Sequence, residues 1–590
     1  MTPDLTPIAI EPGAEDEPNL MRKGVKTWLK INALAILIGI VGGLGAIIFR
    51  KMIEFFNILF FEILLPHITF MVRGYNLGVI ILPAIGGFIV GPIINKVAPE
   101  TKGHGVPEVI EAVTMHGGNI RARVAAVKIL VSSLTIGSGG SVGREGPIAQ
   151  IGSSFGSFLG QKFNLEESYR KLLVTCGLAS GISATFMAPL GGAIFGIEVI
   201  YSGIAPYDVI PILLSSVTGM FITAEVFGMA PAFILPIYRF SNPLELLYFI
   251  PFGLFFGVLS IIWTRGLYKF EDFFDDLTIP EWIKPGIGGL FTGFLGMFFL
   301  NYGVLGIGYE GLEQAIAGSL PFKLLMVLGI AKFLSTSITI GSGSSGGIFA
   351  PSLYMGGMIG GALGLIMVNL PLASSATFVY TLVGMAALFA GAARAPLTCV
   401  IMLPEMSANY YLFPPLMLAC ASSYFISTLH MPDSIYTLKL RRRGVNVAKT
   451  VSPLHLVYVE DVMTPLEQVV TVKPSTPVSV VNFMIWETEH TGFPVCDDTG
   501  YYGMITFEDI SHIPDEDKER VLVKSLAKKD LPKVYPTDNI YSVMEKLNEN
   551  GYEILPVLDP FNDDKIIGVI SDSDVLHSFS VGQDKMRLFG

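Results

Sequence analysis

The sequence is short of charge for its length. Asp, Glu, Lys and Arg make up 15% of its 590 residues, whereas hydrophobic residues make up 51%. A water-soluble protein of this composition would expose large apolar patches, which disfavours a purely soluble globule. The chain is also longer than one ordinary core requires. We therefore expect at least two structural units, the larger of them in a membrane.

Signatures of metal, disulfide and nucleic-acid chemistry are missing as well. The four cysteines have neither metal-ligand nor disulfide spacing, which suits a reducing cytoplasm. The eight histidines include no pair at ligand spacing on one helix, so a membrane metalloenzyme has no support. The C-terminal part has no basic run, which disfavours nucleic-acid binding. We expect no enzyme activity, no metal and no required cofactor.

Apolar stretches recur from Ile31 to about Ile426, and several reach the roughly 20 residues that a helix needs to cross a hydrocarbon layer of about 30 Å. Examples are residues 32–49, 172–200, 250–263 and 378–403. Segments 148–159 and 352–365 are shorter and rich in Gly, with Pro before each, and we predict half-helices or re-entrant segments there. Interrupted backbone at membrane depth must be buried in protein or line a polar cavity, so these segments indicate a transport pathway.

Charges beside the first and last spans predict the orientation. Basic residues precede the first span and follow the last, which predicts an even number of crossings with both ends in the cytoplasm. They are Arg22, Lys23, Lys26 and Lys30, and Lys439, Arg441, Arg442 and Arg443. An acidic stretch at residues 11–17 precedes the first span and no small-residue cleavage site follows it. We therefore expect a retained span rather than a signal peptide.

The apolar region repeats itself. Residues 135–147 read TIGSGGSVGREGP and residues 339–351 read TIGSGSSGGIFAP, in register at a separation of 204. Further on, Ala-Pro-Leu at 188–190 and Glu198 match Ala-Pro-Leu at 395–397 and Glu405, at a separation of 207. Transport folds built from two such halves place the substrate site at their interface near the bilayer midplane.

In each half a Gly/Ser-rich loop leads to a proline that can occupy the first turn of a helix. Helix N-termini offer free N–H groups and a positive dipole end, so two that meet at depth would bind an anion without a fixed positive charge. The alternative is that these glycines only allow close helix packing. That interpretation suits Gly356, Gly360 and Gly364 taken singly.

Four motifs resemble those of the CLC family of chloride channels and proton/chloride exchangers. They are GREGP at 143–147, GIFAP at 347–351, GHGVP at 103–107 in the position of the family's GSGIP, and Tyr436. The resemblance covers nearly all of the chain beyond the N-terminal tail. It implies a homodimer with one anion pathway per subunit, inverted repeats and cytoplasmic termini.

The resemblance also implies roles for individual residues. The amides of Ile348 and Phe349 and the hydroxyl of Tyr436 would hold a central chloride, and Glu145 would be the gate. The other positions expected at the anion site are His104, Gly105, Arg144, Gly146 and Gly347. A carboxylate among helix N-termini imitates chloride, so protonation or a competing chloride would release it. The alternative for Glu145 is a buried ion pair with Arg144.

Two departures from the family pattern bear on mechanism. His104 replaces the usual serine, and it could donate to the anion, titrate near neutral pH or point aside. Val199 follows Glu198 where exchangers usually carry a second acid, and valine is typical of the channels. We predict a passive chloride channel gated by voltage or pH; the alternative is a proton-coupled exchanger. Pro107 and Pro147 argue against the fluoride-exporting branch.

After Arg443 the sequence becomes charged and forms two similar units that resemble a tandem CBS pair. In nucleotide-binding CBS pairs, the aspartate of [S/T]-x-x-D takes the ribose hydroxyls and the hydroxyl residue contacts phosphate. The resemblance implies Asp509 and Asp574 for ribose and Thr506 and Ser571 for phosphate of an adenine nucleotide. The alternative is that both motifs only cap helices.

The predicted fold class is an all-α polytopic membrane domain with inverted repeats and many broken or re-entrant helices, followed by a soluble α/β CBS pair. We expect it in the plasma (inner) membrane, with lipid, chloride and a second copy of the chain as partners. The predicted parts are a tail at 1–24, a transmembrane domain at 25–440 with repeats at about 25–230 and 240–440, a linker at 441–455, and CBS domains at 456–515 and 516–590.

Overall fold

The computed structural model describes residues 17–201, 208–233, 235, 242–445, 457–488, 490–497, 500–560 and 562–578, with side chains from residue 27 onward except at 549, 550, 563 and 564. The chain divides into two compact units, residues 1–447 and 448–590, and each is described by itself. Residues 1–16 of the predicted tail and 446–455 of the predicted linker lie outside the described residues.

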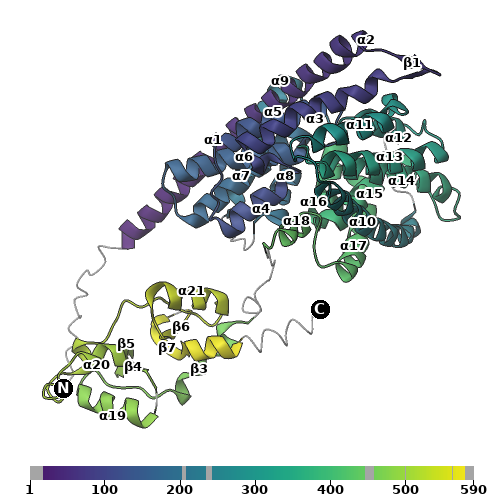
Figure 1. Cartoon of the computed structure of the whole chain (residues 1–590). Coiled ribbons are helices and arrows are strands. Elements are labelled where there is room, and N and C mark those ends of the chain that lie inside the picture. Colours follow the sequence, from purple (N-terminus) through teal and green to yellow (C-terminus); the bar gives the residue numbers. More distant parts are fainter. Residues whose placement is uncertain are drawn as a thin grey trace. The chain divides into compact units, whose positions relative to one another are not determined.

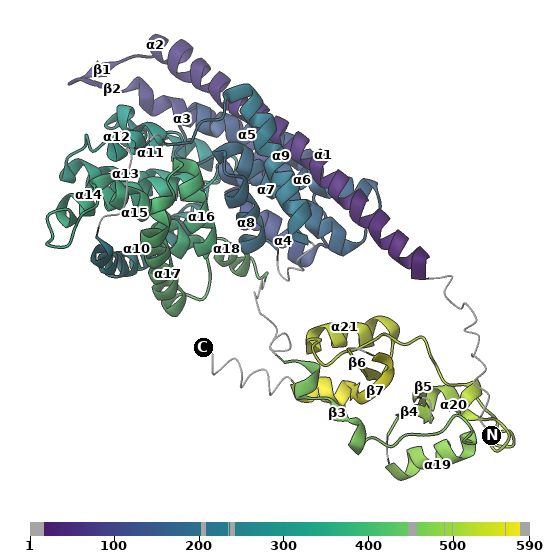
Figure 2. The same cartoon turned by 180° about the vertical axis from the view of Figure 1, so that it is seen from behind.

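The first unit is helical apart from a short hairpin of β1 (Met71–Val72) and β2 (Tyr75–Asn76). Its helices are α1 (Glu17–Asn57), α2 (Leu65–His67), α3 (Gly78–Val97), α4 (Val106–Met115), α5 (Arg123–Gly137), α6 (Glu145–Lys162), α7 (Glu167–Phe186), α8 (Pro189–Val199), α9 (Val209–Phe227), α10 (Leu246–Asp275), α11 (Lys284–Met297), α12 (Tyr309–Ile316), α13 (Phe322–Gly341), α14 (Phe349–Met367), α15 (Thr377–Ala393), α16 (Pro396–Ser407), α17 (Phe413–His430) and α18 (Thr437–Arg442). Figures 1 and 2 place α4 and α18 at one end of this unit and the hairpin at the other.

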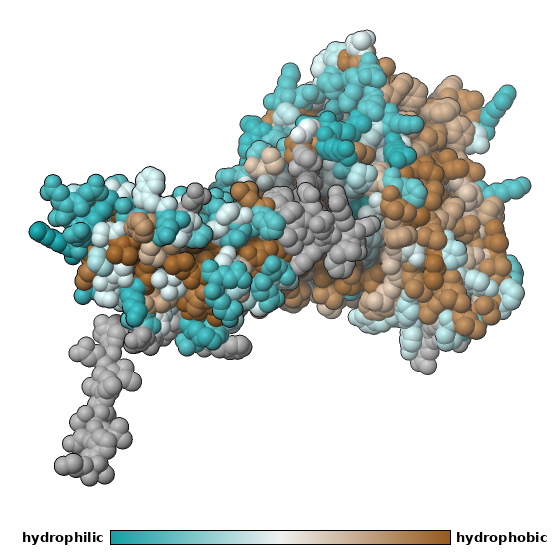
Figure 3. Space-filling view, turned by 90° about the horizontal axis from the view of Figure 1, so that it is seen from below, coloured by the Kyte–Doolittle hydropathy of each residue, from teal (hydrophilic) through white to brown (hydrophobic). Residues whose placement is uncertain are grey.

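Seven helical segments among the described residues are long and apolar enough to cross a membrane. They are Thr27–His67, Gly78–Val97, Val209–Phe227, Pro243–Asp275, Phe322–Gly341, Phe349–Met367 and Tyr410–His430. Hydrophobic residues, brown in Figure 3, gather over the flank of this unit. Large apolar side chains of this unit, such as Phe221, Ile262 and Phe425, are exposed, as a lipid-facing surface requires.

Two of the predicted apolar stretches are broken in the same way. Residues 172–200 divide into α7 and α8 at Met187, and residues 378–403 divide into α15 and α16 at Arg394. Both residues are left-handed, with φ of 55° and 60°, and the next helix begins with a proline in its first turn. Since 394 − 187 = 207, the two breaks are equivalent positions of the repeat.

The short helices α8 and α16 lie side by side (Figures 1 and 2) and cap each other. Glu198, near the end of α8, accepts hydrogen bonds from the amides of Leu397 at 3.0 Å and Thr398 at 2.8 Å in the first turn of α16. Glu405 of α16 accepts from the amides of Leu190 at 3.1 Å and Gly191 at 2.6 Å in the first turn of α8. Each half of the repeat thus supplies the carboxylate that satisfies the free N–H groups of the other.

Helices α6 and α14 are longer than predicted. The expected half-helices at 148–159 and 352–365 are continuous helices of 18 and 19 residues. Their glycines lie inside continuous helices, at points where the backbone of a neighbouring helix comes close. A Cβ on Gly156 would lie 2.1 Å from the Leu173 carbonyl oxygen, and a Cβ on Gly360 would lie 2.5 Å from the Tyr380 carbonyl oxygen. Small residues here bring helices close together, as is common in membranes.

The second unit is an α/β pair of similar halves. The first half contains β3 (Thr464–Pro465), α19 (Val478–Thr488), β4 (Gly492–Asp497), β5 (Gly500–Thr506) and α20 (Phe507–Ser511); the second contains α21 (Ile540–Asn550), β6 (Ile554–Asp559) and β7 (Asn562–Ser571). Strands β4 and β5 form one antiparallel hairpin, and β3, β7 and β6 form a three-stranded sheet in that order. Because β3 pairs with β7, the two halves share this sheet.

Candidate functional site

Three loops that are far apart in the sequence meet at the centre of the first unit. Gly143 and Gly347 exchange backbone hydrogen bonds of 2.7 and 2.6 Å. The Gly103 amide donates to Ser344 at 3.0 Å and the Gly346 amide donates to the Gly103 carbonyl at 3.2 Å. The two repeat loops and the GHGVP loop therefore form one structure, from which α4, α6 and α14 begin.

Glycine is required where these loops touch. A Cβ on Gly146 would lie 2.0 Å from the His104 carbonyl oxygen, a distance that no packed side chain reaches. Gly105 has a φ of +86°, and a Cβ there would lie 2.8 Å from the Gly146 carbonyl oxygen. A Cβ on Gly347 would lie 2.8 Å from the Gly146 amide nitrogen. The loops approach each other because they carry no side chains at these positions.

Glu145 is the first residue of α6 and is 1% exposed. One carboxylate oxygen accepts from the Tyr309 hydroxyl at 3.2 Å, and the other lies 3.4 Å from the amide of Ala350 in the first turn of α14. Ile348 and Phe349, which precede Ala350, are buried at the start of α14. The carboxylate thus lies where the N-termini of α6 and α14 converge.

Arg144 makes its contacts away from Glu145. Its guanidinium donates to the Thr185 carbonyl at 3.4 Å and lies 5.4 Å from the centre of the Tyr309 ring. Within the described part of the chain, no ion pair joins Arg144 to Glu145. Arg144 instead lines a cavity of about 740 Å³ on the hairpin side, with Arg50, Glu54, Tyr309 and Glu310. We call this the outer cavity.

His104 lies between two tyrosines. Its Nε2 is 3.3 Å from the Tyr268 hydroxyl, which donates to the Ile435 carbonyl at 2.5 Å. The ring centre of Tyr436 is 5.9 Å from that of His104. His104 Nδ1 is buried without a hydrogen-bond partner. Tyr436, Ile348 and Phe349 are all buried in the large hydrophobic core of the first unit.

Val199 occupies the last turn of α8 and is 5% exposed. An aliphatic side chain offers no group to carry a proton at this position. The adjacent Glu198 is engaged as the cap of α16. The last turn of α8 therefore carries an aliphatic side chain at position 199 and an engaged carboxylate at position 198.

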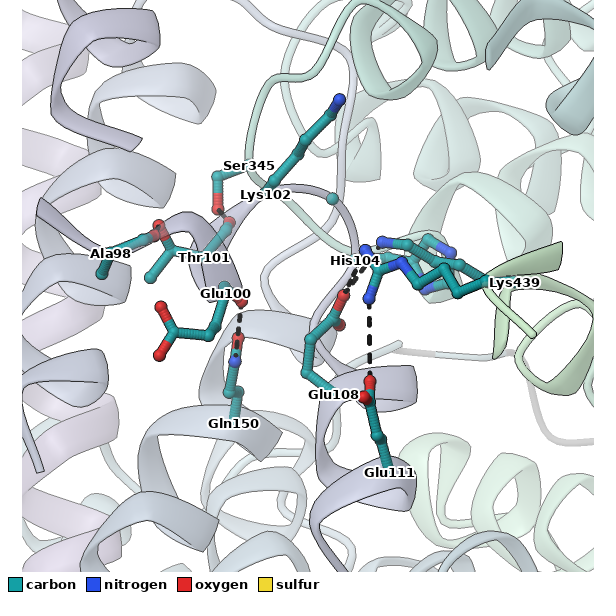
Figure 4. A network of polar contacts seen from close by, with 12 residues as sticks. Ala98, Glu100, Thr101, Lys102, His104, Glu108, Glu111, Gln150, Ser345 and Lys439 are labelled. Carbon is teal, nitrogen blue, oxygen red and sulfur yellow. Dashed lines mark hydrogen bonds and ion pairs between the residues drawn. The ribbon is translucent and has the colours of Figure 1, made fainter. Parts of the chain in front are cut away.

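Two buried lysines near the site have no counterpart among the predicted residues. Lys128 donates to the carbonyls of Thr101 and Gly103, both at 3.0 Å. Its repeat equivalent Lys332 donates to those of Gly303 at 2.9 Å and Gly306 at 2.8 Å. Lys128 thus stabilises the loop at residues 101–103 (Figure 4), and Lys332 stabilises the loop at residues 303–306. Their identical positions in the repeat were a signal that could have found them.

The CBS motifs cap their helices in the second unit. Asp509 accepts from the Thr506 amide at 2.8 Å and hydroxyl at 2.7 Å, and Asp574 accepts from Ser571 in the same way, at 2.8 and 2.7 Å. The second motif borders a cavity. That cavity, the CBS cavity, measures about 330 Å³ and is lined by Ser571, Asp574, Thr464, His490 and Phe493 among others.

At the first motif Lys528 forms an ion pair with Asp509. Its ammonium lies 2.8 Å from the second oxygen of Asp509. This hydrogen bond raises the pKa of Lys528 above its ordinary value, so the lysine is protonated at neutral pH. Thr506 and Asp509 are therefore engaged with each other and with Lys528.

The family models match both units. Residues 86–428 match the voltage-gated chloride channel model, and residues 459–515 and 523–581 match the CBS domain model. The H(+)/Cl(-) exchange transporter ClcA of Yersinia pestis bv. Antiqua (strain Angola) is 31% identical over 435 residues, which cover 71% of this chain and 88% of that relative.

Solved structures share the fold. A slow cyanobacterial Cl-/H+ antiporter is 26% identical, with a TM-score of 0.64 over 71% of this chain and 99% of its own. A eukaryotic CLC transporter is 18% identical, with a TM-score of 0.60 over 92% of this chain and 98% of its own. With its converging helix N-termini, repeated halves and shared CBS sheet, the chain belongs to the voltage-gated chloride channel family, the CLC family, and carries a tandem pair of CBS domains.

Proposed function

We propose that this protein is a chloride channel in which the Glu145 carboxylate is the gate. The observation that carries the proposal is the position of Glu145 at the convergence of α6 and α14, within 3.4 Å of the Ala350 amide. A carboxylate there occupies a place suited to a chloride ion, because free N–H groups and two positive dipole ends face it. When the carboxylate leaves, an anion can take its place.

Protonation and displacement both open such a gate. A proton removes the charge that the helix N-termini attract, and a chloride competes for the same N–H groups. Tyr309 donates to the closed carboxylate and stands at the outer cavity, so the outer cavity offers space into which the side chain swings. Moving one charge through the field is worth about 2.3 kcal/mol per 100 mV, which makes this gate sensitive to voltage.

The conduction mode rests on Val199. A proton-coupled exchanger needs a titratable group on the inner side, and valine cannot serve. The alternative, proton-coupled exchange, is favoured by the names of the relative from Yersinia pestis and of the cyanobacterial structure.

Reconstitution at symmetrical chloride separates the two modes. With a pH gradient across the bilayer, a channel has a reversal potential of zero at every pH. A reversal potential that follows the pH gradient, or uphill proton movement driven by chloride, would contradict the channel and establish exchange.

The gate is tested by Glu145→Gln, which keeps the shape of the side chain and removes its charge. Anion flux should become independent of pH and lose most of its voltage dependence. The control is Glu313→Gln, because Glu313 lies on α12 with an exposed side chain. Unchanged gating in Glu145→Gln would refute the assignment.

Family membership supports several further proposals. We propose a homodimer in the plasma (inner) membrane with the α18 end in the cytoplasm and one pathway per subunit, holding chloride through the amides of Ile348 and Phe349 and the Tyr436 hydroxyl. His104 would set anion preference beside Tyr436. His104→Ser should change the ratio of nitrate to chloride permeability if its ring faces the anion; an unchanged ratio would mean that the ring stands aside.

The CBS cavity supports a second proposal, an adenine nucleotide site at Ser571 and Asp574. Within the described residues, no Lys or Arg lines this cavity, which favours AMP or adenosine over ATP, since a triphosphate needs positive charge. Calorimetry should detect AMP binding to the full chain, its loss in Asp574→Ala and its persistence in Asp509→Ala. If ATP, ADP and AMP produced no heat and no thermal shift, the nucleotide site would be refuted. The CBS pair would then have a structural role only.

A further inference from the structure

The β1–β2 hairpin carries exposed apolar residues at the end of the first unit opposite α18 (Figures 1 and 2). Its strands are joined by the two-residue turn Arg73–Gly74, in which both residues have a positive φ, of 50° and 87°, as tight hairpins favour. Phe70, just before the first strand, is 65% exposed, and Met71 within it is 59% exposed. Exposed apolar patches of this kind mark a contact with a membrane or with another protein.

The apolar surface of the hairpin continues onto α11. The Tyr75 ring lies edge-on to the Phe298 ring, with the ring centres 5.0 Å apart, and Phe298 makes a similar contact of 5.4 Å with Phe294. All three rings are exposed, as is that of Phe291, which lies about one turn earlier on α11. Aromatic side chains gather where a membrane meets water. A row of rings that joins the hairpin to the exposed face of a helix in the membrane unit therefore favours lipid over a separate protein.

The helical segment that leads to the hairpin also indicates lipid. Residues Thr27–His67 form an apolar segment of 41 residues. At 1.5 Å per residue it is about 60 Å long, which is about twice the thickness of the hydrocarbon layer. Its large exposed apolar side chains run from Leu29 to Ile63. They stay in lipid only where the segment crosses the membrane obliquely, and its end, with the hairpin after it, then lies at the membrane surface.

The polar groups of the hairpin suit that position. The amides of Phe70 and Gly78 both donate to Asn76 Oδ1, at 3.3 and 3.0 Å. The Leu77 amide donates to the Phe70 carbonyl at 2.9 Å. Backbone groups near lipid must be satisfied in this way. Arg73 is exposed in the turn, and no ion pair among the described residues includes it. A guanidinium is a good partner for phosphate, which lipid headgroups supply.

The segment before the hairpin forms one wall of the outer cavity. The π-helix η1 (Ile58–Leu64) lies between α1 and α2. Phe61 and Glu62 of η1 line the outer cavity together with Leu65 of α2, and β1 begins shortly after α2. The depth of the hairpin in the membrane therefore bears on the position of this wall.

We propose that the hairpin is an anchor in the headgroup layer of the leaflet opposite α18, and that it holds this wall of the outer cavity at a fixed depth. Phe70 and Met71 lie among the upper acyl chains, and Arg73 binds a lipid phosphate. The partner of the hairpin is thus a phospholipid surface. The anchor goes beyond the proposed channel function and does not depend on Glu145.

The test measures the depth of spin labels on the full chain in phosphatidylcholine bilayers. A nitroxide is attached at Met71→Cys in a Cys496→Ser background, because the other three cysteines are buried. Oxygen concentrates among acyl chains, whereas a Ni(II) chelate stays in water. The ratio of oxygen to Ni(II) relaxation should be several-fold higher at position 71 than at Asp515→Cys, whose native side chain is 94% exposed in the second unit.

Two further labels calibrate this depth. Phe221→Cys, on the exposed face of α9, provides the lipid control and should give a high ratio of oxygen to Ni(II) relaxation. Arg73→Cys should give a ratio between those of positions 71 and 515, because the turn lies at the level of the phosphates.

A second measurement tests whether the hairpin holds the cavity wall. A label at Leu59→Cys reports the depth of η1, where the native side chain is 37% exposed. In the double variant Phe70→Asn, Met71→Asn, the ratio of oxygen to Ni(II) relaxation at position 59 should fall several-fold, because the hairpin leaves the lipid. Leu429→Asn is the matched control, since it makes an exposed apolar side chain of α17 polar and should leave that ratio unchanged.

Three results would overturn the anchor. A ratio at position 71 equal to that at position 515 would place the hairpin in water. A label at position 71 that is shielded from both reagents would mean that protein covers the hairpin, either a second copy of the chain or another protein. An unchanged ratio at position 59 in the double variant would show that the hairpin does not hold the cavity wall. None of these results bears on Glu145, so the anchor and the gate are tested separately.

Discussion

At the scale of single residues, Gly146 is the tightest point of the site. A methyl group there would lie 2.0 Å from the His104 carbonyl oxygen and 3.2 Å from Gly347 Cα. Because both neighbours are backbone atoms, the loops must shift. We expect Gly146→Ala to destabilise the protein by about 1–3 kcal/mol, as overpacking does, and to abolish most anion flux.

Gly45→Ala is the control for this prediction, because the added methyl would meet only Ile151 at an ordinary 3.6 Å. Thermal unfolding in detergent and chloride efflux from liposomes measure the two effects. Wild-type flux in Gly146→Ala would mean that the loops can separate without harm.

The buried lysines give a second prediction at this scale. Replacement of Lys128 or Lys332 by Met leaves loop carbonyls without a donor, and each unsatisfied buried group costs about 1–3 kcal/mol. Lys332→Met should lose at least as much as Lys128→Met, since Lys332 holds a third carbonyl, that of Val304, at 3.3 Å. Lys323→Met, at the exposed start of α13, should leave the unfolding temperature unchanged. Equal unfolding temperatures for all three variants would contradict this assignment.

Motifs predicted some site residues and left others unseen. Glu145, Ile348 and Phe349 stand in repeated loops whose composition is visible along the chain. Tyr309 reaches Glu145 across a separation of 164 residues, and no local pattern marks a tyrosine for such a contact. Gln150 was hidden for the same reason, because its amide donates to the carbonyl of Glu100, which lies in another segment.

At the scale of helices, hydropathy alone predicted continuous apolar stretches where the chain breaks. Met187 and Arg394 take left-handed conformations, but apolar residues continue on both sides of each, so mean hydropathy does not change there. The repeated Ala-Pro-Leu was the informative signal, because a proline fits the first turn of a new helix. The opposite error at 352–365 arose because glycine was taken as a helix break, whereas α14 uses it for packing.

The reciprocal caps give a prediction for these elements. We expect Glu198→Leu and Glu405→Leu each to cost about 0.5–2 kcal/mol, the range for loss of a helix cap. Glu198→Leu should cost more, since Glu198 also accepts from the Thr398 hydroxyl at 2.7 Å. Exposed Glu225 on α9 provides the control Glu225→Leu. Unfolding temperatures equal to wild type would show that water caps these helices equally well.

At the scale of whole units, the Lys528–Asp509 pair predicts how the second unit responds to pH. The raised pKa of Lys528 means that the pair stabilises the folded state fully below the ordinary lysine pKa, about 10.4, and less as pH rises through the folded value. The lysine side chain is 39% exposed, so we expect only about 0.2–1 kcal/mol.

Lys528→Met in the segment 448–590 should therefore lower the urea midpoint by the same amount at pH 6 and pH 8, and by less near pH 11. A difference that grew with pH would contradict the sign of this argument. Lys518 forms an ion pair with Asp515, whose side chain is 94% exposed, so Asp515→Asn is a control that should have a smaller effect at every pH.

The exchange of caps between α8 and α16 has a consequence for biosynthesis. The amide of Leu190 finds its carboxylate 215 residues later in the chain. At 5–20 residues per second, a ribosome needs roughly 10–40 s to reach that point. During this interval the first-turn amides of α8 lack the Glu405 carboxylate. The final packing of α8 must therefore wait until the second half has been translated.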